Sequence, residues 1–430
     1  MFRDCPECTA FPRYGVVVIS GDKQQGATHR DDPPAVSAVS DGTAALYIHI
    51  PFCEKRCSYC DFYTVADRHE AIPAYVASLV REMELCAGQP FWRQQQFSTL
   101  FFGGGTPSLL TPDQLHTLIV AARENFTFCD QAEISMEANP GTTSAQHLVD
   151  FARAGINRLS LGVQSFDADE LKKLDRIHTV QDVYRTVEQA RRAGIGNLSV
   201  DLMFALPGQR PSVWRRTLEQ AVALETEHIS AYNLTVEPGT PLFFQIQKGE
   251  TRPLSEWKER TMFNFTIDFL AGQGYSHYEV SNYARPGFHS RHNMKYWDGS
   301  AYLGLGASAH SFDGQRRWRN VENYVHYIRD LEQGQLARTG EEEVDMAKRK
   351  LEMIFLSLRV RTGLSLARWT ELFGTEFRQE YRDILRLLMN GPKPLLCEQD
   401  GCIRLTREGL FLCDSVCEQF VAEQSISASA

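Results

Sequence analysis

Strand-like runs alternate with helix-like segments along the first half of this chain, and that alternation limits the fold more than any other feature. Apolar, β-rich runs predict strands at 46–50, 98–102, 132–137, 158–163, 197–203 and 228–234. Helical periodicity with capping residues predicts helices between them at 72–87, 112–125, 143–154, 180–193 and 211–224. Repeated βα units imply parallel strands, so we expect an α/β fold built on a partial parallel (βα)6 barrel.

Polar or glycine residues follow each predicted strand. In barrels of this kind the chemistry lies at the carboxyl ends of the strands. The residues at these ends are the cysteine run after the first strand, Gly103 to Thr106 after the second, Glu137, Gln164, Asp201, and Tyr232 with Asn233. Any one of them could serve structure alone, by capping a turn or satisfying the backbone. Their joint position on one rim predicts a ligand site there.

Three cysteines, Cys53, Cys57 and Cys60, lie within eight residues of the loop after the first strand. Thiolates this close favour zinc, Cu(I) or an iron–sulfur cluster. A closed structural zinc site needs four ligands, whereas three cysteines on a four-iron cluster leave one iron open to a substrate or cofactor. A zinc-binding structural protein is the alternative, but it would leave the rim residues unexplained.

The triplet Gly103, Gly104 and Gly105 also indicates a ligand site. Glycines let backbone groups approach a ligand with no Cβ in the way. The run lacks the lysine of a P-loop and the GxGxxG spacing of dinucleotide-binding folds. Phosphate is therefore not the implied ligand.

Composition limits the protein class and its location. The chain has 430 residues with a formal net charge of −9, which argues against a nucleic-acid-binding surface. Its 11 cysteines, mostly scattered, fit a reducing cytoplasm better than a disulfide framework. No apolar run is long enough for an integral membrane segment. Residues 1–44 contain Pro33-Pro34 and several acids and predict a disordered leader, not a transit or signal peptide.

Several motifs occur in order from Tyr47 onward: Tyr-Ile-His-Ile-Pro-Phe-Cys, Cys-x3-Cys-x2-Cys, Gly-Gly-Gly-Thr-Pro, Gly-Val-Gln-Ser-Phe and Asp-Leu-Met-Phe-Ala-Leu-Pro-Gly-Gln. Together they closely resemble the radical S-adenosylmethionine (SAM) superfamily. Within it they resemble the coproporphyrinogen-oxidase-like branch, which includes HemN and the HemW haem chaperones. The resemblance runs from about Tyr47 to the C-terminus.

The resemblance implies a [4Fe-4S] cluster on Cys53, Cys57 and Cys60, with SAM chelating the fourth iron. By the same resemblance, Gly104, Gly105 and Thr106 would contact the amino group of SAM, and Glu137 would contact its ribose. Other groups of SAM would be contacted by Gln164, Arg176 and Asp201. The resemblance also assigns Tyr47 and Tyr59 to the cofactor site. Arg176 suits a carboxylate because its planar guanidinium can pair with one in a bidentate manner.

Two features distinguish members of this branch. HemN-type enzymes carry a fourth cysteine two residues after the third, whereas Phe62 stands at that position here. A phenyl ring can neither ligate iron nor transfer hydrogen, so porphyrinogen oxidation is disfavoured while cluster binding is not. The segment His292 to Trp297 resembles the HNxxYW motif of HemW-like proteins, which is associated there with haem. His292 is therefore a candidate haem contact, and packing at a domain junction is the alternative.

These features predict a HemW-type haem chaperone that passes haem to apo-proteins such as respiratory haem enzymes. The alternative is an oxygen-independent coproporphyrinogen III dehydrogenase. An electron donor would be needed if SAM is cleaved.

The C-terminal part is expected to differ in architecture from the barrel. We expect the barrel to occupy residues 45–280 and a HemN-like C-terminal domain to occupy 281–430. Helices are predicted near 346–360 and 376–390, followed by a hairpin with an Asp400-Gly401 turn and a further helix. This predicts a mainly helical domain with a small winged-helix-like end.

Overall fold

The computed structural model describes residues 41–427. Residues 1–40 of the predicted leader lie outside the described part of the chain. Among the described residues, no helix combines the length and apolarity that crossing a membrane requires.

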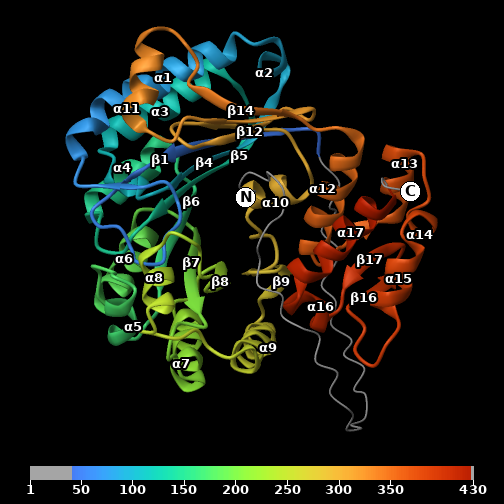
Figure 1. Ribbon diagram of the computed structural model, residues 1–430. Helices are drawn as coiled ribbons and strands as arrows, with labels where there is room; N and C mark the ends of the chain where they lie inside the picture. Colours follow the sequence, from blue (N-terminus) through green and yellow to red (C-terminus); the bar gives the residue numbers. More distant parts are fainter. Residues whose placement is uncertain (1–40, 428–430) are drawn as a thin grey trace. The chain divides into compact units, whose positions relative to one another are not determined.

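A parallel sheet forms the centre of the structure, as predicted. Its six predicted strands are β1 (Ala44–Ile50), β4 (Gln96–Gly104), β5 (Thr127–Ala138), β6 (Arg158–Gln164), β7 (Asn197–Phe204) and β8 (His228–Asn233). They are adjacent in this order and every neighbouring pair is parallel. The partial barrel expected from the sequence is therefore confirmed (Figure 1).

The helices between these strands also match the prediction. They are α1 (Ile72–Ala87), α3 (Pro112–Asn125), α4 (Ala145–Ala154), α6 (Val180–Arg192) and α7 (Pro211–Ala223). Thr111 and Thr179 begin α3 and α6 with complete capping boxes, which satisfy backbone donors of the first turn. Helices α1, α3, α4 and α6 contact one another in that order. The sequence periodicity thus places one helix layer along the sheet.

The sheet continues beyond the predicted strands at both edges. β11 (Tyr302–Leu305) pairs in parallel with β1, and β12 (His310–Phe312), β13 (Arg316–Asn320) and β14 (Arg338–Glu343) follow it in antiparallel order. On the other edge, β10 (Asn282–Ala284) pairs with β8, and β9 (Ser276–Glu279) pairs with β10. The sheet has twelve strands in total and runs past residue 280, where the sequence suggested a domain boundary.

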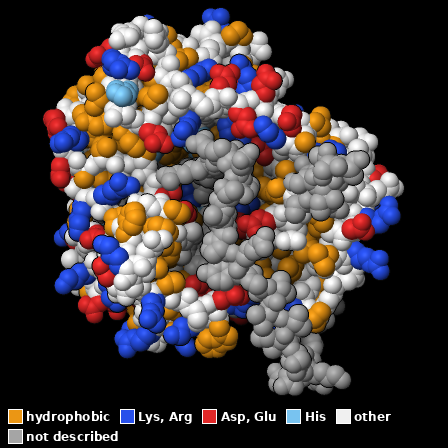
Figure 2. Space-filling model, viewed as in Figure 1, with side chains coloured by type: hydrophobic (Ala, Val, Ile, Leu, Met, Phe, Trp, Pro, Cys, Tyr) orange, Lys and Arg blue, Asp and Glu red, His pale blue; other side chains and the backbone are white. Residues whose placement is uncertain are grey.

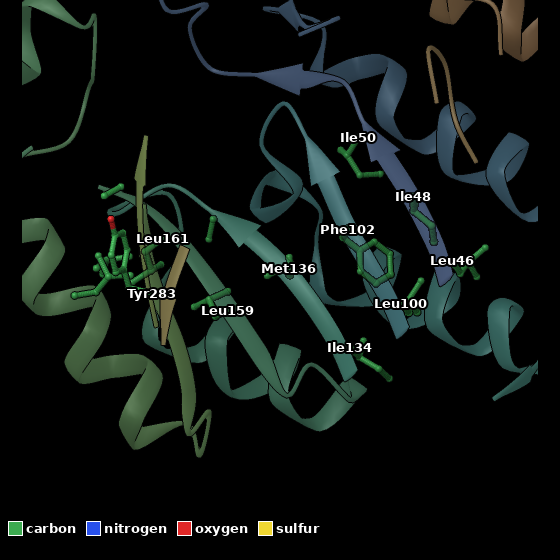
Figure 3. Packing of buried hydrophobic residues seen from close by; sticks show 14 of the residues in the cluster. Leu46, Ile48, Ile50, Leu100, Phe102, Ile134, Met136, Leu159, Leu161 and Tyr283 are labelled. Atoms are coloured by element: carbon green, nitrogen blue, oxygen red, sulfur yellow. The ribbon is translucent and has the colours of Figure 1, made fainter. Parts of the chain in front are cut away.

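Alternate residues of the parallel strands face two different environments. Leu46, Ile48 and Ile50 of β1, with Leu100, Phe102, Ile134, Met136, Leu159 and Leu161, belong to one buried apolar cluster (Figure 3). The residues between them in sequence, including His49, Glu137, Ser160 and Asp201, point to the opposite face because side chains alternate along a strand. One face of the sheet is therefore core, and the other carries the polar groups of the candidate site.

The C-terminal part combines helices with a small sheet. Its helices are α12 (Met346–Arg359), α13 (Leu366–Phe373), α14 (Phe377–Glu380), α15 (Arg382–Met389), α16 (Arg407–Phe411) and α17 (Cys413–Ser427). The predicted hairpin is β16 (Leu396–Gln399) and β17 (Cys402–Leu405), and β15 (Leu364–Ser365) adds a third strand. The helix predicted over 376–390 is two helices, because Tyr381 leaves helical geometry.

This part contacts the end of the sheet-forming segment directly. Arg407 pairs with Asp268 of α9 (Glu256–Gly272) at 2.7 Å, and Val280 N donates to Arg359 O at 3.0 Å. The remaining elements are the helices α2 (Pro90–Gln94), α5 (Ala168–Lys173), α8 (Pro241–Gln247), α10 (Arg291–Trp297) and α11 (Tyr324–Glu332), and the short strands β2 (Phe52–Cys53) and β3 (Val65–Ala66).

Candidate functional site

The cysteine loop starts where β1 ends. Cys53 lies in β2, which pairs in parallel with β3, and the loop between these two strands carries Cys57 and Cys60. Cys53 is buried, the other two thiols are partly exposed, and all three are free. The pairing of β2 with β3 closes the loop, so the three thiols stay close in space as well as in sequence.

Burial favours the protonated form of two of these thiols. It raises the pKa of Cys60 from 9.0 to about 11 and also raises the pKa of Cys53, and the neighbouring thiols add to both shifts. A metal cluster that binds here must therefore displace protons. Within residues 41–427, no three His, Cys, Asp or Glu side chains converge closely enough to hold a single metal ion.

The glycine triplet lies so close to neighbouring residues of the protein that no side chain would fit there. A Cβ on Gly103 would lie 2.9 Å from the Tyr47 ring, and one on Gly104 would lie 2.4 Å from the His49 ring. A Cβ on Gly105 would lie 2.7 Å from the carbonyl oxygen of Phe52. The triplet therefore brings the end of β4 against β1 and the start of the cysteine loop. The sequence had suggested close approach to a ligand, and the structure adds this packing requirement.

Two buried carboxylates face the interior beside the triplet. Glu137 accepts a hydrogen bond from Gly104 N at 3.0 Å, and Asp201 accepts one from the Ser160 hydroxyl at 3.0 Å. Burial, together with the nearby Asp201, raises the pKa of Glu137 from 4.5 to about 7. Burial also raises the pKa of Asp201. Carboxyl groups held in this way can accept hydrogen bonds from hydroxyl or ammonium groups of a ligand.

Arg176 joins the cysteine loop to the strand ends. Its Nη1 donates to the Cys57 sulfur at 3.7 Å, and its Nη2 donates to Gly162 O at 2.6 Å and to Asn139. Its Nε is buried and has no hydrogen-bond partner among the described residues. A buried donor without a partner is costly, and a carboxylate beside the cysteine loop would satisfy it. The residues present therefore fit an anionic ligand next to a thiol-bound cluster.

Comparison with known proteins places this arrangement in a family. Residues 47–221 match the model of the Radical SAM superfamily, and residues 347–412 match that of the HemN C-terminal domain. The chain is 35% identical to the Heme chaperone HemW of Lactococcus lactis, with 88% of this chain and 97% of the relative covered. It is 36% identical to the HemW of Bacillus subtilis, with 88% and 99% covered.

A solved structure agrees with these sequence matches. The coproporphyrinogen III oxidase HemN of Escherichia coli, a radical SAM enzyme, superposes with a TM-score of 0.75 at 26% identity, over 88% of this chain and 90% of that one. The chain belongs to the HemN/HemW branch of the radical SAM superfamily. Membership in the superfamily implies a [4Fe-4S] cluster and SAM.

The remaining predicted SAM contacts lie close to Arg176 and the loop. Thr106 donates a hydrogen bond to the Cys53 sulfur at 3.5 Å. Gln164 ends β6 with φ of 66°, a conformation that costs free energy for a residue with a side chain. Backbone strain of this kind concentrates at functional sites. The structure thus brings Thr106, Gln164 and Arg176 to the same end of the sheet, and their contact with SAM stays a prediction.

The two predicted tyrosines lie in β1 and in the cysteine loop. The Tyr47 hydroxyl is 3.0 Å from His49 Nδ1, and the Tyr47 ring stacks on Phe101 at 6.1 Å. Tyr59 lies within the cysteine loop, where burial raises its pKa while the nearby Arg176 opposes that shift. Neither contact tests cofactor binding, which stays a prediction for both residues.

Phe62, which replaces the fourth cysteine of HemN-type enzymes, follows the loop directly. Its side chain is 51% exposed. It contributes no sulfur to the site, and exposure leaves it little packing role. Phe62 therefore lies at the surface beside the cysteine loop.

His292 lies inside the protein, on α10. Its Nδ1 is 2.8 Å from the Thr99 hydroxyl, and its Nε2 is 3.0 Å from the Tyr296 hydroxyl. Burial lowers its pKa from 6.5 to about 3. An axial ligand needs a ring nitrogen whose lone pair is available, and both nitrogens of His292 have hydrogen-bond partners. These contacts favour a positioning role, and haem contact by His292 stays a prediction.

One ion pair that holds the cysteine loop could not be predicted from the sequence. Lys55, inside the loop, forms an ion pair of 2.7 Å with Asp175, the residue before Arg176. The pair lies 120 residues apart in the chain, so no local pattern could have identified it. Asn139, which accepts a hydrogen bond from Arg176, was also missed, because a single asparagine after a strand is no specific signal.

Proposed function

We propose that this chain is a HemW-type haem chaperone, which holds a [4Fe-4S] cluster and SAM, binds haem and transfers it to apo-proteins. The observation that carries the proposal is the similarity along most of its length to proteins named as haem chaperones. Phe62 adds support from chemistry, since a phenyl ring cannot take the part of the fourth cysteine in porphyrinogen oxidation.

Cys53, Cys57 and Cys60 would hold the cluster, and SAM would chelate its fourth iron. Arg176 would pair through Nε with the SAM carboxylate, because that buried donor has no partner in the described part of the chain. Gly104, Gly105 and Thr106 would meet the amino group, and Glu137, Gln164 and Asp201 would meet the rest of the molecule. When bound, SAM supplies a sulfonium C–S bond that an electron from the cluster can cleave.

Oxygen-independent coproporphyrinogen III dehydrogenase is the second candidate function. The structural similarity to HemN supports it, since both chains share the sheet and the C-terminal part. Phe62 stands where HemN-type enzymes carry a fourth cysteine, and this weighs against the dehydrogenase function. The dehydrogenase function predicts that this chain converts coproporphyrinogen III, and the chaperone function predicts that it does not.

Partners follow from the chaperone function. Haem-accepting apo-proteins, with respiratory haem enzymes as the expected class, would receive the cargo, and SAM cleavage would require an electron donor. The proposed location is the cytoplasm. Lys and Arg side chains are interspersed with Asp and Glu on the face shown in Figure 2, so a nucleic-acid partner is not proposed.

The test is an anaerobic comparison with Escherichia coli HemN. Protein reconstituted with iron and sulfide is incubated with SAM, a reductant and coproporphyrinogen III, and separately titrated with haem. We expect HemN to form protoporphyrinogen IX and this chain to form none, while this chain binds haem at micromolar concentration and releases it to an apo-haem protein. Product formation by this chain, or no haem binding, would overturn the chaperone function.

A further inference from the structure

We propose that Asp175 is a positioning residue for the cluster site, which holds the cysteine loop in the form that binds the cluster. The inference rests on the proposed function, because the cluster on Cys53, Cys57 and Cys60 is part of that function. It goes further by making retention of the cluster depend on a carboxylate outside the loop, 120 residues after Lys55 in the chain.

The carboxylate of Asp175 contacts the loop on both sides of Cys57. Its Oδ1 accepts a hydrogen bond from Lys55 Nζ at 2.7 Å, and Lys55 lies two residues before Cys57. The hydroxyl and the backbone N–H of Ser58, the residue after Cys57, also donate hydrogen bonds to this carboxylate. None of these donors is a thiol, so the contacts do not compete with cluster binding. Asp175 therefore holds the chain around Cys57 and leaves its sulfur available to iron.

The carboxylate is charged when it makes these contacts. Partial burial alone would raise its pKa, but the hydrogen bonds from Lys55 and Ser58 and the charge of Lys55 hold the pKa of Asp175 below its ordinary value of 3.8. An exposed ion pair alone contributes little to stability, and the Lys55 side chain is half exposed. Hydrogen bonds from a hydroxyl and a backbone N–H to a charged carboxylate are stronger and more directional. Ser58 therefore carries more of the restraint than Lys55.

The backbone of Asp175 directs the next residue, Arg176, towards the same loop. Asp175 has φ of 56°, the left-handed conformation that commonly ends a helix. Its N–H donates to Lys172 O at 3.2 Å, and the N–H of Arg176 donates to Leu171 O at 2.9 Å. These two bonds form a Schellman motif at the end of α5. The turn sets the direction in which Arg176 leaves the helix, and its guanidinium reaches the Cys57 sulfur at 3.7 Å.

A second element, α8, also holds the loop. The backbone N–H of Leu242, in the first turn of α8, donates to Ser58 O at 2.9 Å. Ser58 thus has its hydroxyl and N–H bound to Asp175 and its carbonyl bound to α8. Inside the loop, Cys60 N donates to Cys57 O at 3.3 Å. The segment between the second and third cysteines is therefore fixed through Ser58 by two separate parts of the fold.

A fixed loop favours cluster binding, because ligands that are already in place lose less conformational freedom when they bind. Without the Asp175 carboxylate the loop would keep its hydrogen bond to α8 but would lose the contacts on both sides of Cys57. The thiolate of Cys57 would then dissociate from iron more often. We therefore expect weaker retention of the cluster with the fold unchanged.

The experiment measures how fast the cluster loses iron to a chelator after anaerobic reconstitution of the full-length protein. Asp175→Gly removes the carboxylate and keeps the left-handed turn, which glycine adopts freely. Asp175→Asn keeps an acceptor oxygen without the charge. Asp169→Asn is the matched control, because Asp169 is an exposed acid on the same helix. Thermal unfolding of the cluster-free proteins checks that each variant keeps its fold.

We expect Asp175→Gly to release iron about tenfold faster than the wild type, which corresponds to the loss of one charge-assisted hydrogen bond. Asp175→Asn should lie between the two, because its amide oxygen can still accept from Ser58, and Asp169→Asn should match the wild type. Electron paramagnetic resonance of the reduced cluster is the second readout. A displaced Cys57 ligand changes that spectrum, whereas a general loss of stability does not.

A further variant keeps the test decisive if Asp175→Gly unfolds at a lower temperature than the wild type. Lys55→Gln removes one of the donors from the exposed side of the loop and leaves the end of α5 intact. It should also release iron faster than the wild type, by less than Asp175→Gly.

The outcomes separate this inference from the proposed function. If the wild type binds the cluster, and Asp175→Gly and Lys55→Gln keep its rate of iron release and its spectrum, the positioning role is wrong and the proposed function stands. Equally fast iron release in Asp169→Asn and Asp175→Gly would assign the effect to α5 as a whole and would also overturn the inference. If the wild type itself assembles no cluster, the proposed function fails and the inference fails with it.

Discussion

Arg176 donates a hydrogen bond from Nη1 to the sulfur of Cys57 at 3.7 Å, so the loop after α5 contacts the cysteine loop directly. The same guanidinium holds Gly162 O at 2.6 Å, at the end of β6. Only Nε has no partner among the described residues. This one side chain therefore links the thiol loop, a strand end and the space in which SAM is proposed to bind.

Replacing Arg176 with Lys should weaken SAM binding while leaving the cluster in place. A lysine keeps the charge but has no planar fork, so it cannot hold Gly162, Cys57 and a carboxylate together. A lost charge-assisted hydrogen bond costs about 1.5–3 kcal/mol, which corresponds to a tenfold to hundredfold loss of affinity. Isothermal titration of the cluster-loaded variant with SAM checks this, and iron analysis provides the control. Equal SAM affinity in the variant would contradict the role proposed for Nε.

Replacing Cys57 with Ala should abolish the cluster. In the proposed function three thiols hold the cluster, and the two that remain would be too few. Iron and sulfide content and the visible absorbance after anaerobic reconstitution measure the effect. Cys402→Ala is the matched control, because Cys402 is a free cysteine in β17 of the C-terminal sheet. A Cys57→Ala protein that retains full iron content would contradict the ligand assignment.

The parallel part of the fold could be predicted because each of its strands carries a short, β-rich apolar run and is followed by a segment of helical periodicity. The strands β11 to β14 could not, since they are short and partly polar. β14 (Arg338–Glu343) consists largely of exposed charged residues. The partner of β11 is β1, more than 250 residues earlier, and a local pattern carries no information about such a contact. Sequence periodicity therefore identified the parallel core and missed the antiparallel edge.

The sequence predicted where the site residues lie along the fold better than it predicted which of them contact one another. Strand ends identified Glu137, Gln164 and Asp201 because parallel strands bring their carboxyl ends together. The pairing of Lys55 with Asp175 and the packing of the glycine triplet on His49 depend on tertiary structure alone. The hydrogen bonds of His292 were equally invisible in the sequence. Its motif indicated importance without indicating that both ring nitrogens have hydrogen-bond partners.

Gly104→Ala should destabilise the protein strongly. The added Cβ would lie 2.4 Å from the His49 ring, and Gly104 has φ of 116°, which L side chains rarely adopt. The ring cannot move away easily, because hydrogen bonds of 3.0 Å hold it to Tyr47 and to Tyr63 O. Overpacking and backbone strain together should cost about 2–5 kcal/mol.

Thermal unfolding of Gly104→Ala against Gly196→Ala tests this expectation. A Cβ on Gly196 would meet nothing within 4 Å and its φ is not in the restricted range, so that variant is the matched control. Equal melting temperatures of the two variants would show that the end of β4 adapts to a side chain.

Phe62→Ala should leave both stability and cluster content nearly unchanged. The ring is 51% exposed, so its removal opens no cavity, and surface substitutions usually change the free energy of unfolding by about 0.5 kcal/mol or less. Chemical denaturation and iron analysis measure the two quantities. Loss of the cluster in this variant would show that the ring shields the cluster loop, which the exposure of the side chain does not suggest.

Acid should destabilise the protein in part through His292. Burial holds its pKa in the folded state at about 3, against 6.5 for the exposed side chain. Below pH 6.5 the unfolded state binds a proton that the folded state excludes, so stability is present above 6.5 and is lost as the pH falls towards 3. In this pH window the free energy of unfolding falls by up to about 1.4 kcal/mol per pH unit for one such histidine. The positive charge of Lys295 contributes to this low pKa, and no carboxylate is among the causes of the shift.

The variant His292→Gln removes the proton-binding group while keeping a donor and an acceptor for Thr99 and Tyr296. It should lower stability at pH 7.5, because the amide cannot reproduce both hydrogen bonds of the ring. Its free energy of unfolding should nevertheless fall less steeply between pH 6.5 and 4 than that of the wild type. Urea denaturation across this range measures the slope, and His116→Gln, at an exposed position on α3, should leave it unchanged. An identical slope in His292→Gln and wild type would mean that His292 takes up its proton without unfolding, and that the interior around Thr99 and Tyr296 opens readily enough to admit a ligand.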